Sequence, residues 1–407
     1  MSHLCYCSAA FGNWGIVRMG TLVPECHMLF VCPYACGRHN SIGALRHGYK
    51  DRISYLFVES QDLAVGSIEK DLAASVDQIL RELPSRPRVF LIYFSCVLYM
   101  IGFDWDAAID ELSEKHPDIA FRPCMMNPIA ADKKPPVPAM MKTLCSLWEP
   151  SRVKTRDINL LGSYISLGEN HELRRLLRED GGRGLRHFLD AAEYREYRSM
   201  GSSCLNLVIR PEGLAAAQAW SSSIPYLFLP VSYHVETVDE QYKTLLAALG
   251  IQADLQPDRE RALRAVRSAR QVIGDRPLAV DSSAVCMPFS LAVALREYGF
   301  TVSDIFAEAP VLETEKISAK KAKRAGIAFH SVSDPVTRER KGRLGRAEIA
   351  VGYVAGYDSG APFAVDLMMD EGMFGYDGII RLMEKLVQAV REPTALEAMI
   401  ESYGLII

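Results

Sequence analysis

The 407-residue sequence lacks long apolar runs, a pronounced net charge and any Cys-x2-Cys pair. No apolar run approaches the roughly 20 residues that a membrane-spanning helix needs, so we expect no membrane partner. The formal net charge of -4 gives no electrostatic reason to expect a nucleic-acid partner. The N-terminus shows no basic segment followed by an apolar stretch, so we expect a cytoplasmic location in which thiols stay reduced.

Short apolar stretches alternate with longer amphipathic ones over nearly the whole chain, without a fixed-period repeat. Residues 53–58 are predicted to form a strand, residues 68–79 carry apolar side chains at helical spacing, and residues 88–94 predict a second, buried strand. These segments make one βαβ unit, and similar pairs follow towards the C-terminus. The pattern predicts an α/β fold with three Rossmann-like parallel-sheet layers around a central cleft.

Polar stretches that contain proline lie near residues 150 and 255 and mark the expected domain boundaries. We expect an N-terminal α/β domain (residues 1–150) with the candidate ligand cysteines, a middle α/β domain (151–255) and a C-terminal α/β domain (256–407).

The C-terminal domain contains a basic segment, residues 316–346, which includes Arg338, Arg340 and Lys341. Such a segment is more often a solvated loop than a site. The alternative is a docking surface for an acidic partner or a carboxylated ligand.

The cysteines are unevenly distributed, because five of the ten lie within the first 36 residues. Soft thiolates suit zinc and iron–sulfur clusters, and the ligands must converge from turns at the ends of rigid elements. Cys7, Cys36 and Cys96 meet this requirement, since two of them lie in glycine-containing turns and Cys96 ends a predicted strand. Composition alone leaves zinc open, although the spacings are not those of common zinc sites.

Two segments carry a resemblance to a known family. Residues 31–37, VCPYACG, resemble the His-Gly-Pro-x-Gly-Cys loop of nitrogenase component 1 proteins, with Cys36 at the ligand cysteine. Residues 95–104 are similar to the second signature of that family, a Ser or Thr and a Cys followed by Ile-Gly-Asp-Asp, with Cys96 at its cysteine. Weaker similarities extend the resemblance over nearly the whole chain, at residues 159–162, 205–207 and 374–378.

The resemblance implies the catalytic component of an ATP-dependent two-component reductase, which receives electrons from a separate iron protein. It implies an iron–sulfur cluster, either 4Fe-4S or an 8Fe P-cluster-like centre, between two homologous subunits of a homodimer, a paralogous heterodimer or a tetramer. Cys7, Cys36 and Cys96 would be its ligands, with Cys5 as the competitor of Cys7. Three thiolates leave a four-iron cluster one ligand short, which implies a fourth from another chain, Cys32 or Cys26.

The sequence also departs from nitrogenases proper. The resemblance places a cofactor-binding histidine shortly before the Gly-aromatic-Asp-Gly motif, but residues 362–375 contain none, and no cysteine lies between Cys204 and Cys286. We therefore expect neither the molybdenum cofactor nor dinitrogen reduction. The chain is closer in length to the tetrapyrrole reductases of the family, and its substrate is not readable from the sequence.

Three histidines are candidates for a catalytic role. His27 and His39 flank the cysteine-rich segment and are candidate proton donors, while His234 follows a predicted strand end and is a candidate for contacting substrate. Hydrogen bonding within the fold is the more common role for such residues. Two rival functions remain open: a metallocluster assembly scaffold without turnover, and a zinc-stabilised binding protein of periplasmic-binding-like architecture.

Overall fold

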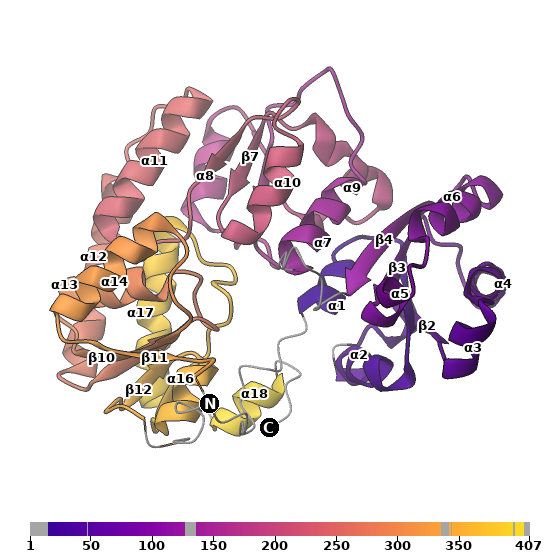
Figure 1. Ribbon diagram of the computed structural model, residues 1–407. Coiled ribbons are helices and arrows are strands. Elements are labelled where there is room, and N and C mark those ends of the chain that lie inside the picture. The colour runs from indigo at the N-terminus through magenta and orange to yellow at the C-terminus, as the bar shows by residue number, and fades with distance from the viewer. Residues whose placement is uncertain are drawn as a thin grey trace. The chain divides into compact units, whose positions relative to one another are not determined.

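The computed structural model describes residues 15–46, 48–126, 136–334, 342, 344–393 and 395–402. The chain divides into two compact units, and each is described by itself. The N-terminal unit takes the described residues within 14–164 and 186–226, and the C-terminal unit takes those within 165–185 and 227–407. Figure 1 labels most of the helices and several strands of both.

The first sheet lies in the N-terminal unit and has the strand order β2-β1-β3-β4. All of its pairs are parallel. Both central strands, β1 and β3, are completely buried, as their apolar sequences CHMLFVC and VFLIYFS require. The strands are β1 (Cys26–Cys32), β2 (Ile53–Phe57), β3 (Val89–Ser95) and β4 (Ala120–Met126).

The two faces of the first sheet are covered differently. One face forms a hydrophobic core with α4 and α6, into which Leu29, Val31, Phe90 and Phe94 project. Because side chains alternate along a strand, Phe30 and Tyr93 lie on the opposite face, where their rings stack at 4.3 Å. The helices of this region are α2 (Tyr34–Arg46), α3 (Ser60–Val65), α4 (Ile68–Glu82), α5 (Cys96–Met100) and α6 (Trp105–Lys115), with a short 3-10 helix, η2 (Lys50–Arg52).

The second sheet has the order β6-β5-β7-β8, and its central strands β5 and β7 pair in parallel. A buried amide pair joins these strands, since Asn159 Nδ2 donates to Asn206 Oδ1 at 2.8 Å. The strands are β5 (Ile158–Leu161), β6 (Leu185–Arg186), β7 (Leu205–Val208) and β8 (Tyr226–Phe228). The further helices of the N-terminal unit are α1 (Gly15–Gly20), α7 (Pro136–Cys145), α9 (Tyr194–Ser199) and α10 (Leu214–Ala219), with η3 (Phe188–Asp190), η4 (Met200–Ser202) and η5 (Pro211–Gly213).

The third sheet belongs to the C-terminal unit and has the order β11-β10-β9-β12-β13, again parallel throughout. Helices α12 and α17 run side by side in this unit (Figure 1). The strands are β9 (Leu278–Asp281), β10 (Val302–Ala307), β11 (Ala328–Ser331), β12 (Ile349–Val351) and β13 (Phe363–Val365). The helices are α8 (Glu172–Glu179), α11 (Val235–Leu249), α12 (Gln256–Ile273), α13 (Pro288–Glu297), α14 (Glu313–Arg324), α16 (Tyr353–Ser359), α17 (Gly375–Arg391) and α18 (Leu396–Ser402).

These sheets confirm the predicted α/β fold with three parallel-sheet layers. The predicted strands and helices from residue 53 to 93 appear as β2, α4 and β3. The three-domain division at residues 150 and 255 and the central cleft stay predictions. Within the described residues, no helix combines the length and the apolar character that a membrane span requires.

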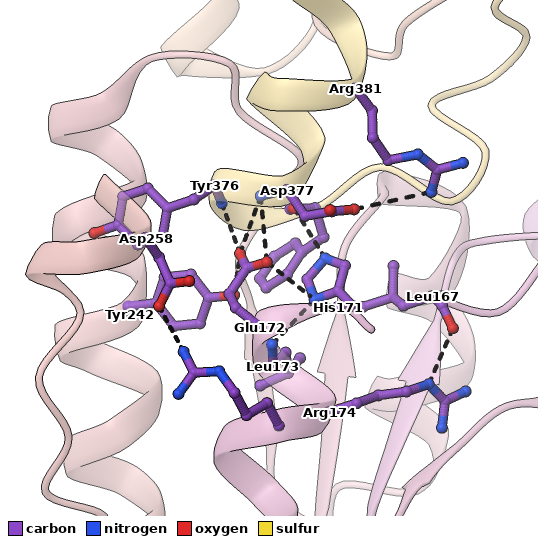
Figure 2. A network of polar contacts seen from close by, with 12 residues as sticks. Leu167, His171, Glu172, Leu173, Arg174, Tyr242, Asp258, Tyr376, Asp377 and Arg381 are labelled. Atoms are coloured by element: carbon purple, nitrogen blue, oxygen red, sulfur yellow. Dashed lines mark hydrogen bonds and ion pairs between the residues drawn. The ribbon is translucent and has the colours of Figure 1, made fainter. Parts of the chain in front are cut away.

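A buried polar network ties the start of α17 to α8 and α11 (Figure 2). The Glu172 carboxylate accepts hydrogen bonds from the Tyr376 N–H at 2.7 Å, the Asp377 N–H at 3.2 Å and the Tyr242 hydroxyl at 2.8 Å. The carboxylate thereby satisfies amide groups at the N-terminus of α17 that have no partner within the helix. Glycine is required at Gly375, because φ is +59° and a Cβ would lie 2.3 Å from Glu172 Oε1.

His171 completes this network from the N-cap position of α8. Its Nδ1 accepts from the Leu173 N–H and its Nε2 donates to the Phe374 carbonyl, both at 3.0 Å. Burial lowers the pKa of His171 to about 4, which keeps the ring neutral in the tautomer that these two bonds need. The weakly predicted motif at residues 374–378 is therefore a packing element of the C-terminal unit.

We predict that Gly375→Ala lowers the free energy of unfolding by at least about 3 kcal/mol, because it adds a collision with Glu172 and Tyr242 to the cost of a left-handed backbone. Gly250→Ala is the matched control, since Gly250 also has a positive φ, +69°, but open space around its Cβ position. The control should lose only about 1 kcal/mol in urea denaturation. Equal losses would contradict the packing role of Gly375.

Candidate functional site

The first sheet has a topological switch point between β1 and β3. The order β2-β1-β3-β4 means that the connection from β1 leads to one side of the sheet and the later connections lead to the other. Open α/β sheets bind ligands at such a point, beyond the carboxyl ends of the two strands. Val31 pairs with Phe94, so β1 and β3 end level with each other.

Cys36 lies in the first turn of α2, directly after the end of β1. Its N–H donates to the Pro33 carbonyl at 2.9 Å, which closes the turn. The next residue, Gly37, is buried, and a Cβ there would lie 2.8 Å from a ring carbon of Phe57 and 3.1 Å from one of Tyr55. The glycine therefore lets the turn that carries Cys36 pack closely on the aromatic side chains of β2.

Cys96 is the first residue of α5 and follows β3 without a break. Like Cys36, it is partly exposed. Burial raises the pKa of Cys36, and the charge of an ionised Cys96 raises it further. Such an effect needs two sulfur atoms near each other, because the interaction of two charges falls with distance. The structure thus brings together two of the three predicted ligand cysteines.

Cys32 is the last residue of β1 and precedes Cys36 by four positions. It is completely buried, and burial raises the pKa of its thiol to about 12, with a smaller contribution from Cys36. Cys32 is thus a neighbour of Cys36 but has no access to the surface.

Large apolar side chains are exposed around the two cysteines. Tyr34 is 74% exposed and Met100 is 70% exposed, although the helices that carry them, α2 and α5, each follow a fully buried strand. The rings of Tyr34 and Phe57 lie 4.9 Å apart. Clustered exposed apolar side chains mark surfaces that bind another molecule. We call this surface the thiol edge, and it consists of Cys36, Cys96, Tyr34, Phe57, Tyr99, Met100 and Ile101.

Cys26, another candidate ligand, does not join the thiol edge, and Cys7 lies outside the described residues. Cys26 is the first residue of β1, about 20 Å along the strand from Cys32 at the usual rise per residue. Burial raises its pKa to about 12. This placement argues against Cys26 as the fourth ligand.

Two of the candidate catalytic histidines have partners close by within their own unit. His27 is buried at the amino end of β1, where its Nε2 bonds Ser54 Oγ at 2.9 Å. His234 belongs to the C-terminal unit, where its Nε2 lies 2.7 Å from Glu297 Oε2 and 3.2 Å from Glu236 Oε2. His39 lies in α2, one turn after Cys36, and its catalytic role stays a prediction. The structure thus gives His27 and His234 each a local partner.

The thiol edge suits part of the ligand set of an iron–sulfur cluster. Cys36 and Cys96 offer two partly exposed thiols within electrostatic reach of each other, in the turns that follow β1 and β3, and cluster ligation uses such thiols. Within the described ranges, no three side chains of His, Cys, Asp or Glu converge closely enough to hold a metal ion.

Sequence reasoning missed the strand that precedes this site. The segment CHMLFVC was interpreted only as cysteine-rich, whereas the structure shows the fully buried β1. Its short apolar run was the available signal, because buried parallel strands have continuous apolar sequences. A strand predicted over this segment would have placed Cys26 and Cys32 at its opposite ends.

The fold and the thiol edge together define a parallel α/β protein with two partly exposed thiols near a topological switch point. The family model described as nitrogenase component 1 type oxidoreductase matches residues 13–391, and the chain belongs to this family. Members of the family bind iron–sulfur clusters and form multimers that work with an iron protein. The predicted family is thereby confirmed.

Solved structures agree with this assignment. The structure of nitrogenase Cp1 at pH 6.5 has a TM-score of 0.75 and 15% identity, over 97% of this chain and 96% of that chain. Nitrogenase Cp1 at pH 5 has a TM-score of 0.64 and 13% identity, over 97% and 90%. At these identities the likeness shows the fold alone. A search of curated protein sequences found no match.

We predict that His27 makes the stability of the protein depend on pH. Burial, with a contribution from Arg52, lowers the pKa of His27 to about 4, so the folded state favours the neutral ring. This stabilisation is complete above the unfolded pKa of about 6.5 and is lost as the pH falls towards 4. Relative to His27→Gln, the wild type should lose about 2 kcal/mol between pH 7.5 and pH 5 in urea denaturation. A parallel loss in both proteins would contradict this assignment.

Proposed function

We propose that this chain is the catalytic component of a nitrogenase-like, ATP-dependent two-component reductase. An iron protein delivers electrons to an iron–sulfur cluster held between this chain and a homologous subunit, and the electrons pass on to a substrate. The observation that supports the proposal is that the partly exposed thiols of Cys36 and Cys96 follow the paired strands β1 and β3 at a switch point with apolar surroundings.

In this proposal Cys36 and Cys96 supply two of the cluster ligands. Cys7 supplies the third, by the family pattern. A four-iron cluster needs one more ligand, and the complete burial of Cys32 in β1 favours a donor from the second subunit. When bound, the cluster would supply one-electron redox chemistry.

The residues of the chain have two tasks around the cluster. The strand ends fix the positions of the two sulfurs, because β1 and β3 are rigid and fully buried. The apolar side chains of the thiol edge exclude water once the second subunit covers them, and solvent exclusion is one of the factors that set cluster potential. The same side chains supply apolar contact area for that subunit. The location of this assembly is the cytoplasm, where a reducing environment keeps the thiols available.

A metallocluster assembly scaffold of the same family is the second candidate. The partial exposure of Cys36 and Cys96 favours the scaffold function, because an acceptor protein can reach a cluster that is bound at an exposed edge. The two functions differ in what happens to the cluster during turnover.

We predict that the anaerobically purified protein, with its co-purifying subunit, shows reduction of its cluster only when the iron protein and MgATP are both present. Electron paramagnetic resonance follows the cluster, and omission of ATP is the control. If the protein instead releases iron and sulfide to an acceptor protein without a cluster, and its own cluster does not cycle between redox states, the scaffold function is correct. A colourless preparation that contains zinc and no iron would contradict both.

We predict that Cys36→Ser and Cys96→Ser each lose most of the bound iron and acid-labile sulfide. Cys204→Ser is the matched control, since Cys204 is also a partly exposed thiol of the N-terminal unit but lies at the start of β7. The control should retain the wild-type metal content. Full iron occupancy in both Cys36→Ser and Cys96→Ser would refute their role as ligands.

A further inference from the structure

Ser95 carries a buried hydroxyl that has no hydrogen-bond partner among the described residues. The residue is the last of β3, is 2% exposed and immediately precedes Cys96. Buried polar atoms in folded proteins nearly always have a partner, and an unpaired one costs about 1–3 kcal/mol. A persistent unpaired hydroxyl therefore calls for an acceptor that the described chain does not supply.

The ordinary reason for serine at this position does not apply. Ser95 is the N-cap residue of α5, where a serine side chain usually accepts a hydrogen bond from the first turn of the helix. The structure shows no such bond. The hydroxyl is therefore not used by the helix that it precedes.

The Ser95 side chain lies on the face of the sheet that α2 covers. Phe94 projects into the core on the α4 side, so alternation places Ser95 on the opposite face. Tyr55 is also on this opposite face, since its ring packs 5.7 Å from that of Phe30. Gly37 of α2 in turn lies against Tyr55. Ser95 is thus on the same side of the sheet as the helix turn that carries Cys36.

Cys32 shares this face with Ser95. Val31 of β1 lies opposite Phe94 of β3. Cys32 and Ser95 are the next residues of these strands, and each is the last residue of its strand. Cys32 also lies within electrostatic reach of Cys36. Ser95 consequently shares its face of the sheet and its strand-end level with Cys32, and the next residue along the chain is Cys96 of the thiol edge.

We propose that the Ser95 hydroxyl donates a hydrogen bond to a sulfur of the bound cluster, either a ligand thiolate or a bridging sulfide. This inference rests on the proposed function. A hydrogen bond to a cluster sulfur stabilises the more negative, reduced state and raises the reduction potential. Ser95 is thus a tuning residue that acts on the potential, not a ligand and not a catalytic residue.

The cluster-loaded protein tests this proposal through Ser95→Ala, Ser95→Thr and Ser54→Ala. Ser54→Ala is the control, because it removes a hydroxyl near the other end of the first sheet. Redox titration followed by electron paramagnetic resonance should give Ser95→Ala a lower midpoint potential with unchanged iron and sulfide content. Ser95→Thr should restore the wild-type potential, and Ser54→Ala should not change it.

An unchanged potential in fully loaded Ser95→Ala would overturn the proposal while leaving the proposed function intact. Loss of iron from Ser95→Ala would make Ser95 a ligand and would also overturn it. A wild type without any cluster would defeat both proposals together.

The metal-free protein gives an independent test. Because the hydroxyl has no partner among the described residues, metal-free Ser95→Ala should unfold at the same urea concentration as metal-free wild type, or at a higher one. A clear loss of stability would show that the hydroxyl already has a partner within the protein, and would overturn the proposal.

Discussion

The parallel, in-register pairing of β1 with β3 is the constraint on which the site depends. Because Val31 lies opposite Phe94, the two strands end at the same level, and the residues that follow them emerge side by side. Cys36 and Cys96 are 60 positions apart in the sequence, yet the pairing makes their sulfurs neighbours. Both strands are completely buried, so neither end can shift without disturbing the core of the sheet.

The alternation of side chains along these strands separates structural from functional positions. Phe94 anchors β3 in the core, whereas Ser95 and then Cys96 lead to the edge of the sheet. At the opposite end of β1, His27 and Cys26 are buried and serve packing and hydrogen bonding. Open parallel sheets generally bind ligands at the carboxyl ends of their strands, which is the end of β1 and β3 that the thiol edge follows.

The sequence predicted the three-layer α/β fold, because the periodicity of β2, α4 and β3 is local and strong. It also singled out Cys36, from the glycine that follows it, and Cys96, from the predicted strand that precedes it, and their role as ligands stays a prediction. It did not predict the separation of Cys26 from Cys32, because a short apolar run is ambiguous. The contact of Glu172 with α17 joins residues about two hundred positions apart, and no local pattern encodes such a contact. The unpaired state of Ser95 likewise requires a structure, because the sequence alone suggests a helix cap.

The central claim is that Cys36 and Cys96 bind one inorganic centre together. Alkylation of the anaerobically isolated protein, read by mass spectrometry before and after iron chelation, tests it most directly. The account predicts that both thiols are protected while iron is bound and become reactive together when it is removed. Independent alkylation of Cys36 and Cys96 in an iron-loaded sample would contradict it.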